Sequence, residues 1–182
     1  MTVLTAVLAL GTVGAPISSA ADSPRVPAGR TAIGDSVMEG AKASLHRRGF
    51  AVDTSISRQV SGGVGVLRTK KDNGTLRRQV VVHLGTNGTF TSSQCRTMHK
   101  IVGKKRNLLL LSVKVPRPWQ ASNNRVIDRC ATRYSNTYLL DWNRYVRQHR
   151  GIVEGDGYHL TPKGARKYAA LVDRRVDQLQ GR

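Results

Sequence analysis

The sequence lacks the motifs that would assign it a cofactor. Its 182 residues contain no glycine-rich phosphate loop, no Rossmann dinucleotide fingerprint and no His-Glu-x-x-His zinc motif. Cysteine is scarce as well. Cys95 and Cys130 are too few for a multi-cysteine zinc module and too far apart for a Cys-x-x-Cys redox pair. We therefore expect an activity that needs no cofactor and no metal ion.

Acidic residues are also few. The chain has 11 Asp and Glu against 30 Lys and Arg, which gives a formal net charge of +19 at pH 7. The cations form short clusters along the chain, such as Lys104-Lys105-Arg106, and do not form one basic tail. Such a surface would attract an anionic polymer of a bacterial wall or a nucleic acid, or it would serve only to keep the protein in solution.

Ionisable side chains are absent from residues 2–20. The apolar run over residues 2–17 leads into the small residues 18–21, a pattern typical of a secretory signal peptide cleaved after Ala20 or Ala21. Because no Lys or Arg precedes the run, the alternative for residues 1–21 is a membrane-proximal apolar segment of a longer protein. We expect residues 22–182 to form one domain that is secreted or lies in the cell envelope of a bacterium.

The compartment would decide the state of the two cysteines. In an oxidising environment Cys95 and Cys130 would form a disulfide, and closing that loop would stabilise the fold by about 4 kcal/mol on the chain-entropy account. In a reducing cytosol both would remain buried thiols.

Short apolar runs alternate with longer amphipathic stretches, which is typical of βαβ units around a parallel sheet. The last helix is the best marked, with Thr161 as N-cap and Pro162 at the first helical position. The expected strands are residues 30–33, 51–56, 79–84, 107–115 and 138–140. The expected helices are residues 37–48, 63–70, 92–102, 123–134 and 162–180.

A serine follows the first expected strand, in Gly34-Asp35-Ser36. At the start of a helix its backbone N–H has no partner within the helix, so one residue could supply both a nucleophile and an oxyanion donor. Asp35 could satisfy the N-terminal amides of the same helix, and capping is also the ordinary use of Asp and Ser at such a position. The tripeptide alone does not decide between a catalytic serine and a helix cap.

An asparagine follows the third expected strand, in Gly85-Thr86-Asn87-Gly88. The carboxamide N–H of Asn87 could stabilise an oxyanion, or the residue could only form a turn before Gly88. We expect His83, within the strand, to be a core or second-layer histidine.

An Asp-x-x-His pair precedes the last helix, in Asp156-Gly157-Tyr158-His159. In one tight turn the Asp156 carboxylate can accept from the imidazole Nδ1–H, which leaves Nε2 free to accept a serine proton. A serine hydroxyl needs such a base at neutral pH. Taken alone, however, the pair also fits a surface turn or a metal-ligand pair.

The three stretches together resemble sequence blocks of the SGNH (GDSL-like) hydrolases, over about residues 28–180. The resemblance implies a flavodoxin-like, three-layer α/β/α sandwich with a central parallel sheet. It implies Ser36 as nucleophile, His159 as base and Asp156 as the carboxylate that orients the base. The implied oxyanion hole consists of the Ser36 N–H, the Asn87 side chain and the backbone N–H of Ser57, where family members usually have glycine.

Further segments resemble the extracellular SGNH domain of membrane acyltransferases, among them peptidoglycan O-acetyltransferases. These segments are Arg58-Gln59, Gly88, Val115-Pro116-Arg117-Pro118-Trp119 and Asp141-Trp142. From them we expect Arg58 and Trp119 to bind the substrate. Trp119 could stack on a sugar ring or could only anchor a loop.

The sequence thus predicts a serine enzyme that acts on acyl esters of a cell-envelope glycan, or of a small molecule, through an acyl-Ser36 intermediate. Water as acceptor makes it an esterase, and a sugar hydroxyl makes it an O-acyltransferase. We expect a monomer without specific nucleic-acid binding, whose partners are an anionic cell-wall polymer and a membrane acyltransferase that donates the acyl group. The alternative is a non-catalytic basic module that binds anionic wall polymer or nucleic acid.

Overall fold

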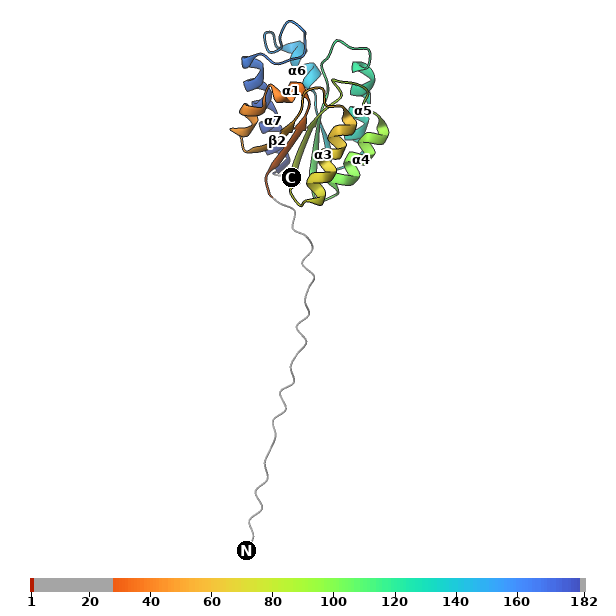
Figure 1. The fold of residues 1–182 in the computed structure, drawn as a ribbon, viewed down its shortest axis with the longest axis vertical. Helices are drawn as coiled ribbons and strands as arrows, with labels where there is room; N and C mark the ends of the chain where they lie inside the picture. Colours follow the sequence, from red (N-terminus) through yellow and green to blue (C-terminus); the bar gives the residue numbers. More distant parts are fainter. Residues whose placement is uncertain (2–27, 181–182) are drawn as a thin grey trace.

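Five short apolar runs form a parallel sheet at the centre of the protein (Figure 1). The computed structural model describes residue 1 and residues 28–180, so the predicted signal peptide lies, apart from its first residue, outside the described part of the chain. The sheet order is β2-β1-β3-β4-β5, and every neighbouring pair is parallel. The strands are β1 (Arg30–Gly34), β2 (Phe50–Thr54), β3 (Gln79–His83), β4 (Asn107–Leu111) and β5 (Thr137–Leu140).

Helices cover both faces of this sheet. They are α1 (Ser36–Glu39), α2 (Lys42–His46), α3 (Val60–Asp72), α4 (Ser92–Val102), α5 (Gln120–Arg133), α6 (Trp142–Gln148) and α7 (Pro162–Gln180). Figure 1 shows α3, α4 and α5 on one side of the sheet, with α1 and α7 on the other. Two separate apolar clusters follow this division, one beneath α3 to α5 and one beneath α1, α2, α6 and α7. The predicted three-layer α/β/α sandwich is confirmed.

Alternate residues of each strand feed the two clusters. On β1, Ala32 faces the cluster under α7, whereas Ile33 faces the cluster under α3 to α5. Because both faces of the sheet are buried, the strands are continuous apolar runs and not alternating ones. This double burial explains why the sequence predicts the strands well.

The structure corrects three of the expected boundaries. The single helix predicted over residues 37–48 is two short helices, because the Ala41 N–H donates to the carbonyl of Met38 (2.9 Å) and interrupts the helical ladder. The fourth strand ends at Leu111, since the N–H and carbonyl of Val113 bond to the Asn124 side chain instead of a neighbouring strand. The second strand ends at Thr54, two residues before the predicted end.

Helix α6 was not predicted. It begins where the Asp141 side chain accepts a hydrogen bond from the Arg144 N–H (3.0 Å), directly after β5. Trp142, the first residue of the helix, is fully buried against Tyr168 of α7. An Asp N-cap after a strand is the signal that marks this helix in the sequence.

Helix α7 is fixed at its N-terminus. The Thr161 hydroxyl accepts from the Gly164 N–H (2.9 Å), which confirms the predicted N-cap. A side chain at Gly164 would lie 1.8 Å from the carbonyl oxygen of Ile152, so only glycine permits this close approach. The approach ties α7 to residues 152–160, the segment that carries Asp156 and His159.

A disulfide joins Cys95 of α4 to Cys130 of α5. The disulfide is one of the two states left open by the sequence, and it lies in the layer of α3 to α5. No helix in the described part of the chain is long and apolar enough to cross a membrane.

Candidate active site

The carboxyl ends of the five strands meet at one edge of the sheet, because all the strands are parallel. The chain leaves β1 toward β2 on one side and returns to β3 on the other, so the strand order changes direction between β1 and β3. In open α/β sheets the ligand site lies at this switch point. Ser36 follows β1 and Asn87 follows β3, one on each side of it.

Ser36, His159 and Asp156 form a hydrogen-bonded chain. The Ser36 Oγ lies 3.0 Å from His159 Nε2, and His159 Nδ1 lies 2.6 Å from Asp156 Oδ2. With the proton on Nδ1, the imidazole donates to the carboxylate, and Nε2 is free to accept from the serine hydroxyl. This arrangement can activate a serine nucleophile.

The turn that carries Asp156 and His159 is held by the Asp156 carboxylate itself. Its Oδ1 accepts from the N–H groups of Tyr158 and His159, both at 3.0 Å. Gly157 has a φ of +83°, a conformation that side chains rarely adopt, so the turn depends on glycine there. Burial acts to raise the pKa of Asp156, but hydrogen bonds from the Tyr158 N–H, the His159 side chain and the His159 N–H together lower it. The carboxylate therefore stays ionised beside the imidazole.

Ser36 is the first residue of α1, and Asp35 is its N-cap. The Asp35 Oδ1 accepts from the Val37 N–H (3.1 Å). The Ser36 N–H lies in the first turn, where a helix offers it no acceptor. Both interpretations of Gly34-Asp35-Ser36 therefore hold: Asp35 caps the helix, and the Ser36 hydroxyl lies within hydrogen-bond distance of His159.

Ser57 holds a left-handed backbone conformation, with a φ of +58°, and is the one non-glycine residue with positive φ in the described part of the chain. Glycine adopts this conformation without strain, which gives a physical reason for the glycine usual in the family at this position. The serine retains a backbone N–H, so it can serve as the donor that the resemblance implies.

Arg58 forms several hydrogen bonds within the protein. Its guanidinium donates to the carbonyl of Gly34 (3.2 Å), to the carbonyl of Asp53 (2.7 Å) and to the Asp53 carboxylate (2.8 Å). These bonds satisfy the side chain within the protein. They tie the loop of Ser57 to the ends of β1 and β2, and the expectation that Arg58 binds substrate stays a prediction.

Asn87 is linked to the same loop. Its Nδ2 donates to the carbonyl of Arg58 at 3.4 Å, a long hydrogen bond that an incoming oxyanion could replace. The turn of Asn87 is held from α5 by the buried Asn123, which bonds the carbonyls of Gly85 (2.9 Å) and Gly88 (2.8 Å). The sequence analysis missed Asn123, because a polar residue on an amphipathic helix gives no signal that it is buried.

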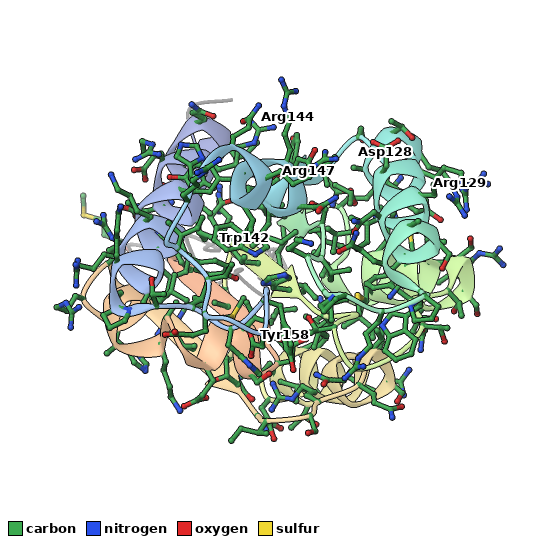
Figure 2. The ribbon with its side chains drawn as sticks, turned by 90° about the horizontal axis from the view of Figure 1, so that it is seen from above. Asp128, Arg129, Trp142, Arg144, Arg147 and Tyr158 are labelled. Atoms are coloured by element: carbon green, nitrogen blue, oxygen red, sulfur yellow. A yellow bond between two sulfur atoms is a disulfide. The ribbon has the colours of Figure 1, made fainter. Side chains whose placement is uncertain are left out.

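A cleft of about 360 Å³ opens beside Ser57 and Asn87. Figure 2 shows Tyr158 near the middle of this end of the molecule. The indole N–H of Trp119 donates to the carbonyl of Thr86 (3.3 Å), so Trp119 anchors its loop to the end of β3 while also lining the cleft. The lining includes Ser57, Gln59, Thr86, Asn87, Trp119 and Tyr158.

A buried polar cluster of Asp35, His83 and Tyr168 lies behind Ser36. The Asp35 N–H donates to the carbonyl of His83 (3.3 Å), and His83 Nδ1 lies 3.0 Å from the Tyr168 hydroxyl. Burial lowers the pKa of His83 to about 3, so this histidine is neutral. Its expected place in the core is confirmed, although its Nε2 has no hydrogen-bond partner among the described residues. Burial also raises the pKa of Asp35 to about 6, although the hydrogen bond from the Val37 N–H acts in the opposite direction.

Among residues 28–180 no group of three or more His, Cys, Asp or Glu could hold a metal ion.

Comparisons with known proteins point to one group. No family model matches the chain. It is 35% identical over 144 residues to YrhL, a candidate peptidoglycan O-acetyltransferase of Bacillus subtilis. The matched segment is 78% of this chain and 22% of that protein. It is 31% identical over 143 residues to the O-acetyltransferase OatA of Staphylococcus aureus. The matched segment is 77% of this chain and 24% of that protein. The chain thus spans less than a quarter of the length of these relatives.

Solved structures share the fold. The C-terminal catalytic domain of a Streptococcus pneumoniae peptidoglycan O-acetyltransferase superposes with a TM-score of 0.77 at 20% identity, covering 86% of this chain and 97% of that domain. A family 3 carbohydrate esterase of Clostridium thermocellum superposes with a TM-score of 0.65 at 15% identity, covering 85% of this chain and 98% of that chain.

The conformation of Ser57 gives a first prediction. We expect Ser57→Gly to be at least as stable as the native protein. Glycine avoids the cost of about 1–2 kcal/mol that a side chain incurs in the left-handed conformation, and the greater flexibility of glycine in the unfolded chain cancels only part of this gain. Ser57→Val should lose stability and, if Ser57 supplies an oxyanion donor, ester turnover as well. Urea unfolding and turnover of a chromogenic ester measure both. Equal behaviour of the two variants would contradict the account.

Burial of Asp35 gives a second prediction. Its pKa is about 6 when folded against a reference of 3.8, so the folded state holds a proton that the unfolded state releases. The native protein therefore loses stability as the pH rises from 3.8 to about 6, by about 3 kcal/mol, and the full penalty remains above pH 6. Asp35→Asn keeps the cap acceptor and removes the penalty.

Urea unfolding of both proteins at pH 3.5 and pH 7.5 measures this effect, since other titrations cancel in the difference. The stability of Asp35→Asn relative to native should be higher at pH 7.5. Asp128→Asn, an exposed position on α5 (Figure 2), controls for removal of one carboxyl group. A difference that is the same at both pH values would rule out the buried carboxyl described here.

Proposed function

The chain belongs to the SGNH (GDSL-like) hydrolases, as a homologue of one part of the peptidoglycan O-acetyltransferases, and from this we propose an exported serine enzyme that acts on acyl esters of a cell-envelope glycan. The observation that carries the proposal is the chain of hydrogen bonds from Asp156 through His159 to Ser36. The names of the sequence relatives support an acetyl group as the acyl group and a peptidoglycan-type glycan as the carbohydrate.

The first half-reaction forms an acyl-enzyme. The Ser36 Oγ attacks the ester carbonyl while its proton passes to His159 Nε2, and Asp156 stabilises the imidazolium that results. The tetrahedral oxyanion accepts hydrogen bonds from the Ser36 N–H, the Asn87 carboxamide and the Ser57 N–H. His159 then protonates the leaving alcohol, and the acyl group remains on Ser36.

The second half-reaction decides between transfer and hydrolysis. His159, again neutral, removes a proton from a sugar hydroxyl or from water, and the resulting oxygen nucleophile attacks the acyl-Ser36 carbonyl. The bond between the acyl carbon and Ser36 Oγ then breaks, and the proton on His159 passes to Ser36 Oγ, which restores the free enzyme. Transfer is supported by the names of the sequence relatives, which are O-acetyltransferases. Those relatives are about four times longer than the matched segment, so we further propose that a membrane acyltransferase supplies the acetyl group.

Location outside the cytoplasm is part of the same proposal. It rests on the apolar run at residues 2–17, on the disulfide between Cys95 and Cys130, and on a glycan substrate that lies outside the cell.

Removal of the nucleophile or the base provides the test of the enzyme. We expect Ser36→Ala and His159→Ala to lower kcat/KM for p-nitrophenyl acetate by about a thousandfold or more, because the remaining groups cannot activate water comparably. Labelling by a fluorophosphonate should also disappear in both variants. Ser135→Ala is the matched control, since Ser135 is exposed just before β5, at the opposite edge of the sheet.

The native protein without ester turnover and without labelling would overturn the proposal. Salt-sensitive binding of a polyanion that persists in Ser36→Ala would then favour the non-catalytic basic module. Mass spectrometry of an envelope-glycan digest, after incubation with the protein and an acetyl donor, separates the two enzymatic outcomes: added acetyl groups indicate transfer, and lost acetyl groups indicate hydrolysis.

A further inference from the structure

The cleft beside the oxyanion donors has one charged side chain, Arg117. Its other lining residues carry uncharged polar, aromatic or aliphatic side chains, such as those of Gln59, Trp119 and Val115. Such groups suit the hydroxyls and the apolar faces of an uncharged sugar ring. Arg117 requires a different explanation, because an uncharged ring offers no counter-ion for a guanidinium.

The guanidinium of Arg117 is available for a ligand. Among residues 28–180 it makes no hydrogen bond and no ion pair, and the residue is exposed. Some arginines are engaged within the protein: Arg58 bonds Asp53, and Arg48 bonds Asp173 at 2.6 Å. Arg117 thus differs from the arginines that hold the fold together.

The backbone that carries Arg117 is rigid. Arg117 lies between Pro116 and Pro118, and the ring of each proline fixes its own φ angle. The Arg117 N–H donates to the carbonyl of Val115 (2.8 Å), and the Arg117 carbonyl accepts from the Gln120 N–H (3.1 Å). The Gln120 side chain closes the loop by accepting from the Val115 N–H (2.8 Å). The Arg117 side chain therefore extends from a fixed backbone position at the rim of the cleft.

The loop is also tied to the catalytic strand ends. Trp119 bonds the carbonyl of Thr86, the residue before Asn87. The position of Arg117 is therefore set relative to the oxyanion donor of β3, and a group that it binds lies at a defined place relative to the reacting acyl group.

We propose that Arg117 binds a carboxylate of the glycan close to the hydroxyl that carries the acyl group, and so selects an anionic over a neutral sugar. The inference rests on the proposed function and names its substrate class. The fork of the guanidinium matches a carboxylate with two parallel hydrogen bonds, a geometry that lysine cannot reproduce. The carboxylate belongs either to the sugar itself or to a peptide attached to it.

The test must separate this local contact from the overall charge of +19, which attracts every anion. Arg129→Gln is the matched control. Arg129 is exposed on α5 and extends outward at the rim of the molecule (Figure 2), so the variant loses the same single charge outside the cleft.

Binding is measured first, in the Ser36→Ala background, so that the result does not depend on catalysis. Calorimetry at physiological ionic strength compares three glycans of equal length: a neutral chito-oligosaccharide, a peptide-free peptidoglycan strand with free sugar carboxylates, and a peptide-bearing strand. We expect a carboxylate glycan to bind more tightly than the neutral glycan. Arg117→Gln should reduce that preference about tenfold, Arg117→Lys should restore only part of it, and Arg129→Gln should leave it unchanged.

The two carboxylate glycans identify the source of the anion. A preference for the peptide-free strand assigns the sugar carboxylate, and a preference confined to the peptide-bearing strand assigns a peptide carboxylate. An unchanged preference in Arg117→Gln, or an equal loss in Arg129→Gln, overturns the inference.

The second experiment measures turnover of acetylated forms of the same glycans by proteins with Ser36 intact. The measured quantity is the ratio of kcat/KM between the anionic and the neutral substrate. If the native protein turns over no ester while the binding preference still depends on Arg117, the proposed function fails and the carboxylate site stands. If turnover proceeds with a ratio that Arg117→Gln does not change, the enzyme stands and the carboxylate site fails.

Discussion

The contact between Ser36 and His159 is the constraint on which the site depends, because it joins residues 123 positions apart in the sequence. Ser36 is placed by β1 and the start of α1, while His159 is placed by a turn that directly precedes α7. The close approach at Gly164 and the N-cap at Thr161 fix that turn. Hydrogen bonds of this kind are weak singly, so the geometry of the pair is a product of the whole fold.

The three proposed oxyanion donors, at Ser36, Ser57 and Asn87, depend on one another in a similar way. Arg58 ties the loop of Ser57 to the carbonyl that precedes Asp35, and Asn87 in turn donates to the carbonyl of Arg58. The donors from three strand ends are therefore connected before a substrate arrives. Donors that are fixed in advance need little reorganisation when charge develops on the carbonyl oxygen, which is the main source of their catalytic effect.

The sequence predicts the central sheet and the order of its elements, because strands buried on both faces are distinctive apolar runs. It also places Ser36, Asn87, Asp156 and His159 next to strand or helix ends, where the structure has them. What it does not predict depends on partners far along the chain. Examples are the bonds of Arg58 to Gly34 and Asp53, the burial of Asn123, and the lack of a partner for the Arg117 guanidinium among residues 28–180. A local pattern contains no information on which distant carboxylate or carbonyl a side chain will meet.

The central claim is that Ser36 becomes covalently acylated. Peptide mass spectrometry of the protein, quenched early in a reaction with an activated acetyl ester, tests it most directly. The account predicts one acetyl group on the peptide that contains Ser36, lost again when water or a sugar acceptor is given time to react. Turnover without acetylation of Ser36, or acetylation at another residue that accounts for turnover, would contradict it.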